Sequence, residues 1–256
     1  MVLQRYKTDH NMLFSGVILL GLLTLGPLLA APATAGTLQF YANGEELVTE
    51  GFLAPKLTKD GWRLTFSHAY VTLAEITAYQ TSPPFDPHDH KDIIAAQRIS
   101  LLGVHTVDLA AGTDDDPPVQ VGEASPAPAG HYNAISWRMQ PAASGPAKGY
   151  SMLLIGQASK GDRKAEFTIG TREEAVYQCG EFVGDQRKGF LTAGGSADLE
   201  MTFHFDHLFG RADKAADAPV NLAAPGFTPF AAAGKVHEIS MDGLHLGHAG
   251  EGHCRQ

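Results

Sequence analysis

Two histidines and an aspartate end a stretch, "MTFHFDHLFG" (201–210), that otherwise alternates like a buried β-strand. Side chains on one face of a strand repeat every two residues, so His204 and Asp206 share the polar face, with their roots about 7 Å apart. This pair could bind one metal ion, or Asp206 could orient an imidazole by accepting its hydrogen bond. Alternatively, the strand simply leaves the core and enters water. His207 falls on the apolar side unless the strand has already ended.

A second group of histidines lies in the C-terminal segment "LHLGHAGEGHC" (244–254). The spacing is H-x-x-H from His245 to His248 and then H-x-x-x-x-H to His253, which is flexible because little bulk separates the ligands, and Glu251 adds a carboxylate. Imidazole suits zinc, copper and nickel, whereas calcium prefers oxygen. If this tail meets the first group, four imidazoles, or three with Glu251 or Asp206, surround a Zn²⁺ or Cu²⁺ ion. Otherwise the tail is a histidine-rich segment in solvent.

The two cysteines of the chain, Cys179 and Cys254, bear on where this tail lies. In an oxidising compartment an even pair usually forms a disulfide, which here would tie the end of the chain to its middle. Two free thiols, or two metal ligands, are the alternatives. A disulfide would bring the tail against the end of the "HFDH" strand.

His68 is a further candidate ligand, because it follows apolar side chains on one face of the alternating stretch 61–79. It is either a hydrogen-bonded histidine of the core or a metal ligand that reaches the site from a neighbouring strand. The apolar phase of this stretch slips near Ala69, which indicates a β-bulge.

Alternating hydrophobicity dominates the chain and helical periodicity is scarce, which predicts an all-β fold. Regular strands with glycine-rich turns favour an antiparallel β-sandwich, Ig-like or prealbumin-like, over residues 36–210. Residues 211–256 shift to Ala, Gly and Pro and are expected to form a mostly irregular extension packed on the sandwich. The plausible short helices are "HKDIIAAQR" (90–98) and "DHLFGRADKAAD" (206–217). The clearest further strands are 130–139, 150–159, 165–170 and 188–206.

The N-terminal residues 1–35 read as a secretory signal peptide. Positive charge precedes an apolar run over 12–29, and Ala33 and Ala35 form a small-x-small cleavage site. An uncleaved anchor is the alternative, because the run is long. After cleavage no second apolar run approaches a membrane span, so a periplasmic or secreted location is expected. The net charge of −9 and the lack of a basic stripe argue against nucleic-acid binding.

The segments "VHTVDLAAG" (104–112) and "VGEASPAPAGHYNAISWRM" (121–139) carry a family resemblance. They resemble a "vDL" strand followed by "paG-x-Y-x-x-I" in exported prealbumin-like or Ig-like sandwich families, namely the DUF4382 family and the periplasmic, copper-associated MbnP-like proteins. The resemblance covers roughly residues 60–170. It implies a sandwich fold and an export-linked role, and metal handling in the MbnP-like case. No family binding residue is carried over.

Catalytic motifs such as G-x-S-x-G, H-E-x-x-H or a Walker loop are missing from the sequence, so we do not expect an enzyme. A zinc hydrolase would need an open coordination position and a base such as Glu251. The expected function is binding, delivery or sensing of zinc or copper by an exported protein. Its partners would be the metal ion and a metal transporter or other envelope protein. The alternative is a carbohydrate- or protein-binding sandwich in which the histidines are incidental.

Overall fold

The computed structural model of the protein describes residues 35–89, 92–112, 118–180, 188–232, 234–249, 252 and 254–256. The expected signal peptide therefore lies outside the described residues, apart from Ala35. None of the helices in the described part is long and apolar enough to cross a bilayer.

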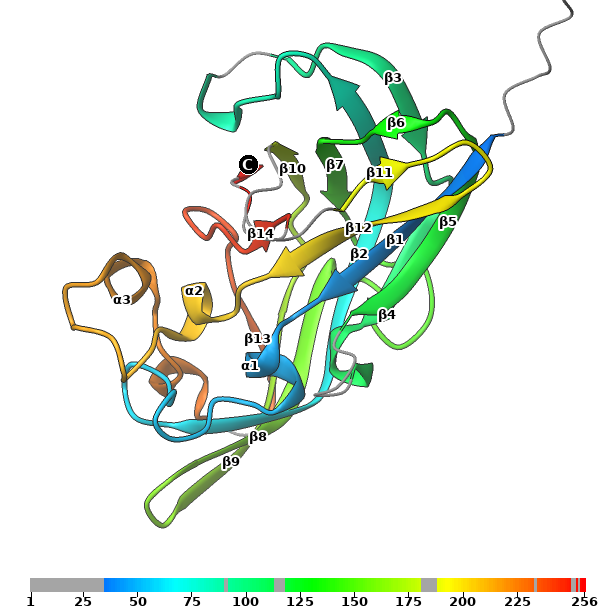
Figure 1. The fold of residues 1–256 in the computed structure, drawn as a ribbon. Helices are drawn as coiled ribbons and strands as arrows, with labels where there is room; N and C mark the ends of the chain where they lie inside the picture. The colour runs from blue at the N-terminus through cyan, green and yellow to red at the C-terminus, as the bar shows by residue number, and fades with distance from the viewer. Residues whose placement is uncertain are drawn as a thin grey trace, which may run out of the picture. The chain divides into compact units, whose positions relative to one another are not determined.

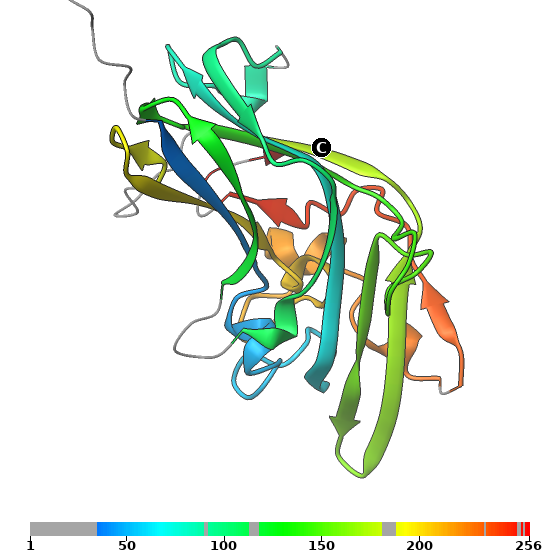
Figure 2. The ribbon, with the colours of Figure 1, turned by 90° about the vertical axis from the view of Figure 1, so that its right-hand side faces the viewer.

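Two β-sheets pack against each other, as Figures 1 and 2 show from two sides. The smaller sheet has the order β14-β12-β1-β5, and its strands span Gly36–Asn43 (β1), Val119–Ala127 (β5), Ser196–Phe203 (β12) and Gly247–His248 (β14). The larger sheet has the order β13-β9-β8-β2-β7-β10-β15, with β3 and β4 also paired to β2. Its strands span Arg63–Thr81 (β2), Ala95–Ser100 (β3), Val104–Asp108 (β4), Ala134–Met139 (β7), Met152–Lys160 (β8), Arg163–Thr171 (β9), Ala175–Gly180 (β10), Val236–Glu238 (β13) and Cys254–Arg255 (β15).

Short elements connect the strands. The strands β6 (Gly130–His131) and β11 (Phe190–Leu191) pair as a separate ribbon. The helical turns are Glu46–Thr49 (α1), Pro87–Asp89 (η1), Leu109–Ala111 (η2), Asp206–Phe209 (α2), Pro219–Ala223 (α3) and Thr228–Phe230 (η3). Of the two predicted helices, the second begins as expected, although it ends after one turn.

The all-β, sandwich-like fold predicted from alternation is confirmed, but strictly antiparallel pairing is wrong. β1 pairs with β12, and β9 with β13, in parallel. Each parallel pair joins strands far apart in the chain, so the connection that parallel pairing requires is long enough. The predicted helix over 90–98 is also wrong from Ala95 onward, because β3 pairs with β2 there and tertiary hydrogen bonding overrides local preference.

The long strand β2 changes its partners along its length. Its first half pairs with β8, its middle with β4, and its second half with β7 and β3. The register with β8 shifts between Phe66 and His68, which confirms the predicted bulge near Ala69. A bulge turns the following side chains to the opposite face. For this reason His68 does not continue the apolar face that precedes it.

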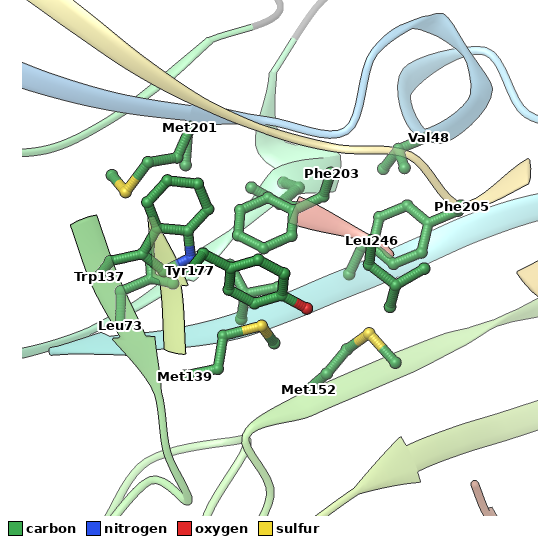
Figure 3. Packing of buried hydrophobic residues seen from close by; sticks show 14 of the residues in the cluster. Val48, Leu73, Trp137, Met139, Met152, Tyr177, Met201, Phe203, Phe205 and Leu246 are labelled. Carbon is green, nitrogen blue, oxygen red and sulfur yellow. The ribbon is translucent and has the colours of Figure 1, made fainter. Parts of the chain in front are cut away.

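Aromatic side chains fill the core between the sheets. The rings of Trp137 and Tyr177 stack with centroids 5.2 Å apart, and Phe203 of β12 meets Trp137 edge-on at 6.3 Å. Figure 3 shows these three side chains together, with Met139 and Leu246 beside them. All are buried, so each contributes about 1.5–3 kcal/mol of hydrophobic stabilisation by removal from water.

The C-terminal extension is mostly irregular, as expected, and its short strands extend three sheet edges. β14 pairs with β12, β13 with β9 and β15 with β10. In Figure 2 the orange and red ribbon of this extension runs from one sheet to the other. Covering an edge satisfies backbone groups that would otherwise be exposed to pairing with another chain. The extension therefore contributes strands to both of the main sheets.

Asp60 fastens this extension to the start of β2. Burial acts to raise the pKa of its carboxyl, but hydrogen bonds from Thr228, Thr58 and the Phe227 N–H outweigh burial and hold the pKa below its ordinary value. A carboxylate with a lowered pKa stabilises the fold above the pKa of the unfolded chain. That contribution is lost as the pH falls through the folded-state pKa.

We predict that Asp60→Asn lowers the free energy of unfolding by about 1–3 kcal/mol at pH 7, since charge-assisted hydrogen bonds are lost. The difference from the unmodified protein should begin to shrink below about pH 4, where this carboxyl becomes protonated in the unfolded chain, and should vanish as the pH falls through the lower folded-state pKa. Denaturant unfolding at pH 7 and pH 3 measures both. The control is Asp162→Asn in the exposed β8–β9 turn. A difference that does not depend on pH contradicts this role of Asp60.

The disulfide gives a second stability prediction. Cys179 and Cys254 are direct partners in the β10–β15 pair and are bonded at a sequence separation of 75, which confirms the expected disulfide. Closing a loop of this length stabilises a fold by about 4 kcal/mol, chiefly by constraining the unfolded chain. We expect a reductant to lower the denaturant midpoint of the unmodified protein and to leave that of the Cys179→Ala/Cys254→Ala variant unchanged. An unshifted midpoint in fully reduced protein would refute the prediction.

Candidate metal centre

Strand β12 carries the first histidine and pairs with neighbours on both sides. On one side its Thr202 is the direct antiparallel partner of His248 in β14. The ladder continues one residue beyond the strand, because the His204 N–H donates to the Leu246 carbonyl at 2.9 Å. Residues at i and j±2 across an antiparallel pair are diagonal neighbours on one face. His204 and His248 therefore lie side by side.

Gly247 lets β14 approach closely enough for this pairing. A Cβ atom at this position would lie 2.8 Å from the Tyr177 ring and 2.9 Å from the Trp137 ring. Such distances are shorter than van der Waals contact, so any larger residue would displace the strand or the aromatic pair. The glycine thus sets the position of its neighbour His248 on the core.

The short helix α2 brings in the second histidine. Phe205, Leu208 and Phe209 are fully buried, which fixes the rotation of this turn on the core. The His207 N–H donates to the His204 carbonyl at 3.2 Å, so the chain turns immediately after the strand. Residues three apart in a helical turn share a face. His207 consequently joins His204 on the polar side, because the strand has ended before it.

The three imidazoles of His204, His207 and His248 converge. One ring nitrogen from each lies within 4.8 Å of the other two, and all three side chains are partly buried. The ring centroids of His204 and His248 are 4.3 Å apart. Tetrahedral zinc, with Zn–N bonds of about 2.0–2.1 Å, holds its ligand nitrogens about 3.3 Å apart. Closing even the widest pair to that spacing moves each ring by less than about 1 Å.

Burial keeps the central ring in the form that binds metal. Desolvation lowers the pKa of His204, the nearby His207 lowers it further, and the negative charge of Asp206 opposes both. An imidazole with a lowered pKa is neutral at pH 7 and keeps a lone pair on one nitrogen. That lone pair is what a metal ion requires.

Glu45 is a residue of this site that sequence reasoning missed. β1 runs parallel to β12 with Asn43 opposite Thr202, and two further residues along both chains place Glu45 beside His204. Its Oε2 lies 3.8 Å from Nδ1 of His204. Burial first, then the charges of Asp206 and Glu46, raise the pKa of the Glu45 carboxyl to about 7, against the effect of Arg211. No local motif signals this contact, because it depends on pairing across the whole chain.

The predicted ligand Asp206 borders the cluster without joining it. The three histidines are the convergent set of possible ligands found in the described part of the chain, and Asp206 is not among them. One oxygen, Oδ2, lies 3.9 Å from Nη1 of Arg211. The other, Oδ1, is buried with no hydrogen-bond partner among the described residues. Asp206 thus contributes negative charge next to the histidines.

His68 lies outside the cluster, which corrects its prediction as a ligand of this site. Its Nδ1 lies 2.7 Å from Oδ2 of Asp108, and its ring stacks on Tyr70 with centroids 5.0 Å apart. The side chain is 46% exposed, so it is not a core histidine either. The β2 bulge is the physical reason, because it turns this position outward on the larger sheet.

Two predicted ligands, His253 and Glu251, lie outside the described residues, so their part in the site stays a prediction. The disulfide that was expected to hold their segment is present, at Cys254. The tail and the "HFDH" segment do meet, through His248.

Comparisons with known proteins found no relative that could indicate the role of this site. No family model matches the chain, and neither the curated proteins nor the solved structures contain a match. The resemblance to DUF4382 and MbnP-like families accordingly stays an expectation.

Proposed function

We propose that the protein binds a transition metal ion, Zn²⁺ or Cu²⁺, through His204, His207 and His248. The observation that carries this proposal is the convergence of three imidazoles from β12, α2 and β14 to within 4.8 Å. Burying several imidazoles together is unfavourable without a partner that uses their lone pairs. A metal ion supplies that partner.

The chemistry of the ligands narrows the choice of metal. Neutral imidazole nitrogens favour zinc and copper(II), whereas magnesium and calcium take oxygen ligands and copper(I) favours thiolate or thioether. The carboxylates of Glu45 and Asp206 lie beside the cluster and offset the charge of a divalent cation. His253 and Glu251 are predicted ligands for the remaining coordination positions.

The proposed role is binding, delivery or sensing outside the cytoplasm. A disulfide is typical of proteins in oxidising compartments, which supports export. The three histidines are only partly buried and one stands on the short edge strand β14, so an ion can exchange without unfolding of the core. A metal transporter or another envelope protein would be the natural donor or acceptor of the ion.

We predict that the protein binds one Zn²⁺ per chain and that His204→Ala, His207→Ala and His248→Ala each weaken binding by about 100-fold or more, because each removes a ligand. Calorimetric titration measures the affinity. Zinc at 100 times its Kd should also stabilise the protein by about 2.7 kcal/mol.

The matched control for these variants is His245→Ala, which removes an exposed histidine three residues from His248. It should bind zinc as the unmodified protein does. Equal zinc binding by the three cluster variants and the control would exclude the site.

The affinity for zinc should depend on pH with a defined sign. Burial lowers the pKa of His204, so this ring stays neutral to a lower pH than an ordinary imidazole, whose pKa is about 6.5. Protons displace the metal only where the imidazoles become charged. We expect constant affinity from pH 7.5 to 8 and a loss of at least about 100-fold by pH 5. Competition titrations with a chelator of known pH dependence measure it, and a constant affinity from pH 5 to 8 contradicts histidine ligation.

A further inference from the structure

We propose that Glu45 is a positioning residue of the metal centre. Its carboxylate accepts a hydrogen bond from Nδ1–H of His204, which fixes the tautomer of that ring and leaves Nε2 to the metal ion. This assignment rests on the proposed function, because it concerns the same three-histidine site. The sequence suggested Asp206 as the residue that orients an imidazole. The structure-based proposal gives this role to Glu45 instead, which lies 159 positions before His204 in the chain.

The two ring nitrogens of His204 have different surroundings. Nδ1 faces Oε2 of Glu45 at 3.8 Å. Nε2 is buried and has no hydrogen-bond partner among the residues that the structure describes. A side-chain movement of about 1 Å brings the first pair to hydrogen-bond distance. Metal-bound histidines commonly donate their other ring N–H to a carboxylate in this way, which raises the basicity of the ligating nitrogen.

The backbone at Glu45 supports a role for its side chain. Glu45 has φ 56° and ψ −173°, a left-handed φ that residues other than glycine rarely adopt. The conformation is held by the Glu45 N–H, which donates to Oδ1 of Asn43 at 2.9 Å, and by the start of α1. Glycine would occupy this position at lower cost. A glutamate kept in a strained conformation beside a functional group suggests that the carboxylate is used.

Asp206 is less suited to this role. Its Oδ2 is directed to Arg211, at 3.9 Å, and its other oxygen has no hydrogen-bond partner within the described part of the chain. The carboxyl group that faces Nδ1 of His204 is that of Glu45, with Oε2 at 3.8 Å. The parallel register of β1 and β12 fixes this arrangement, since Asn43 pairs with Thr202 at the last rung before both chains turn.

The test uses Glu45→Gly, which removes the carboxylate and relieves the backbone strain. We expect the melting temperature of the metal-free variant to stay unchanged or rise, while zinc affinity falls about 10–100-fold and the stoichiometry stays at one. Glu45→Gln keeps a carbonyl acceptor and should lose less affinity. The matched control is Glu50→Gln, an exposed glutamate at the end of α1, which should bind zinc normally.

A second readout reports the tautomer directly. Long-range ¹H–¹⁵N spectra of the imidazole rings, recorded without metal, should show the proton of His204 on Nδ1 in the unmodified protein. In Glu45→Gly the Nε2–H tautomer should increase. A residue that only stabilised the fold would not change this ratio.

The outcomes separate the two proposals. If the unmodified protein binds zinc through the three histidines, and Glu45→Gly binds within about 3-fold with an unchanged tautomer, the role of Glu45 is refuted and the metal site stands. An equal loss of affinity in Glu50→Gln also refutes it, since the effect would then be one of general charge. If the unmodified protein binds no zinc, the proposed function fails, and the tautomer of the metal-free ring still decides whether Glu45 contacts His204.

Discussion

Strand β12 is hydrogen-bonded in parallel to β1 and in antiparallel to β14, and this double pairing determines the rest of the site. The register on each side decides which residues of distant segments meet, because a shift by one residue turns every side chain to the opposite face. Thr202 lies opposite both Asn43 and His248. Because of this register, Glu45 lies on one side of His204 and the imidazole of His248 lies on the other. Neither contact would survive a shifted register.

Core packing holds that register. The buried rings of Phe203 and Phe205 lie on either side of His204 in sequence, and they direct their neighbour away from the core. On the partner strand, Gly247 lies against Trp137 and Tyr177, with no room for a side chain. The polar cluster is therefore positioned by apolar contacts on the opposite face of the same elements. Packed interiors deform little, so the backbone that carries the partly buried imidazoles is held in a defined position.

Much of the fold could be predicted from local sequence, and most of the site could not. Alternation identified the strand regions, the phase slip near Ala69 identified the bulge, and the cysteine count identified the disulfide. Each of these signals lies within a few residues or follows from composition. Glu45 and the strand β3 could not be identified, because their positions follow from pairing with strands far along the chain. His68 was misplaced for the same reason, since the bulge was visible in the sequence but the face it exposes depends on β8.

The disulfide and the proposed metal ion would restrain the same C-terminal segment at two points, Cys254 and His248. Ordering a free tail costs about 1–2 kcal/mol per residue in backbone entropy, which any ligand that needs the tail must overcome. The covalent link to Cys179 removes part of this cost before the metal arrives, so the tail histidine is held near His204 in advance. If the protein binds a metal as proposed, its affinity would therefore depend on the oxidation state of the cysteines. Under the proposed function, the protein would bind its ion tightly only after it had folded and formed its disulfide, as expected of a protein that acts in an oxidising compartment.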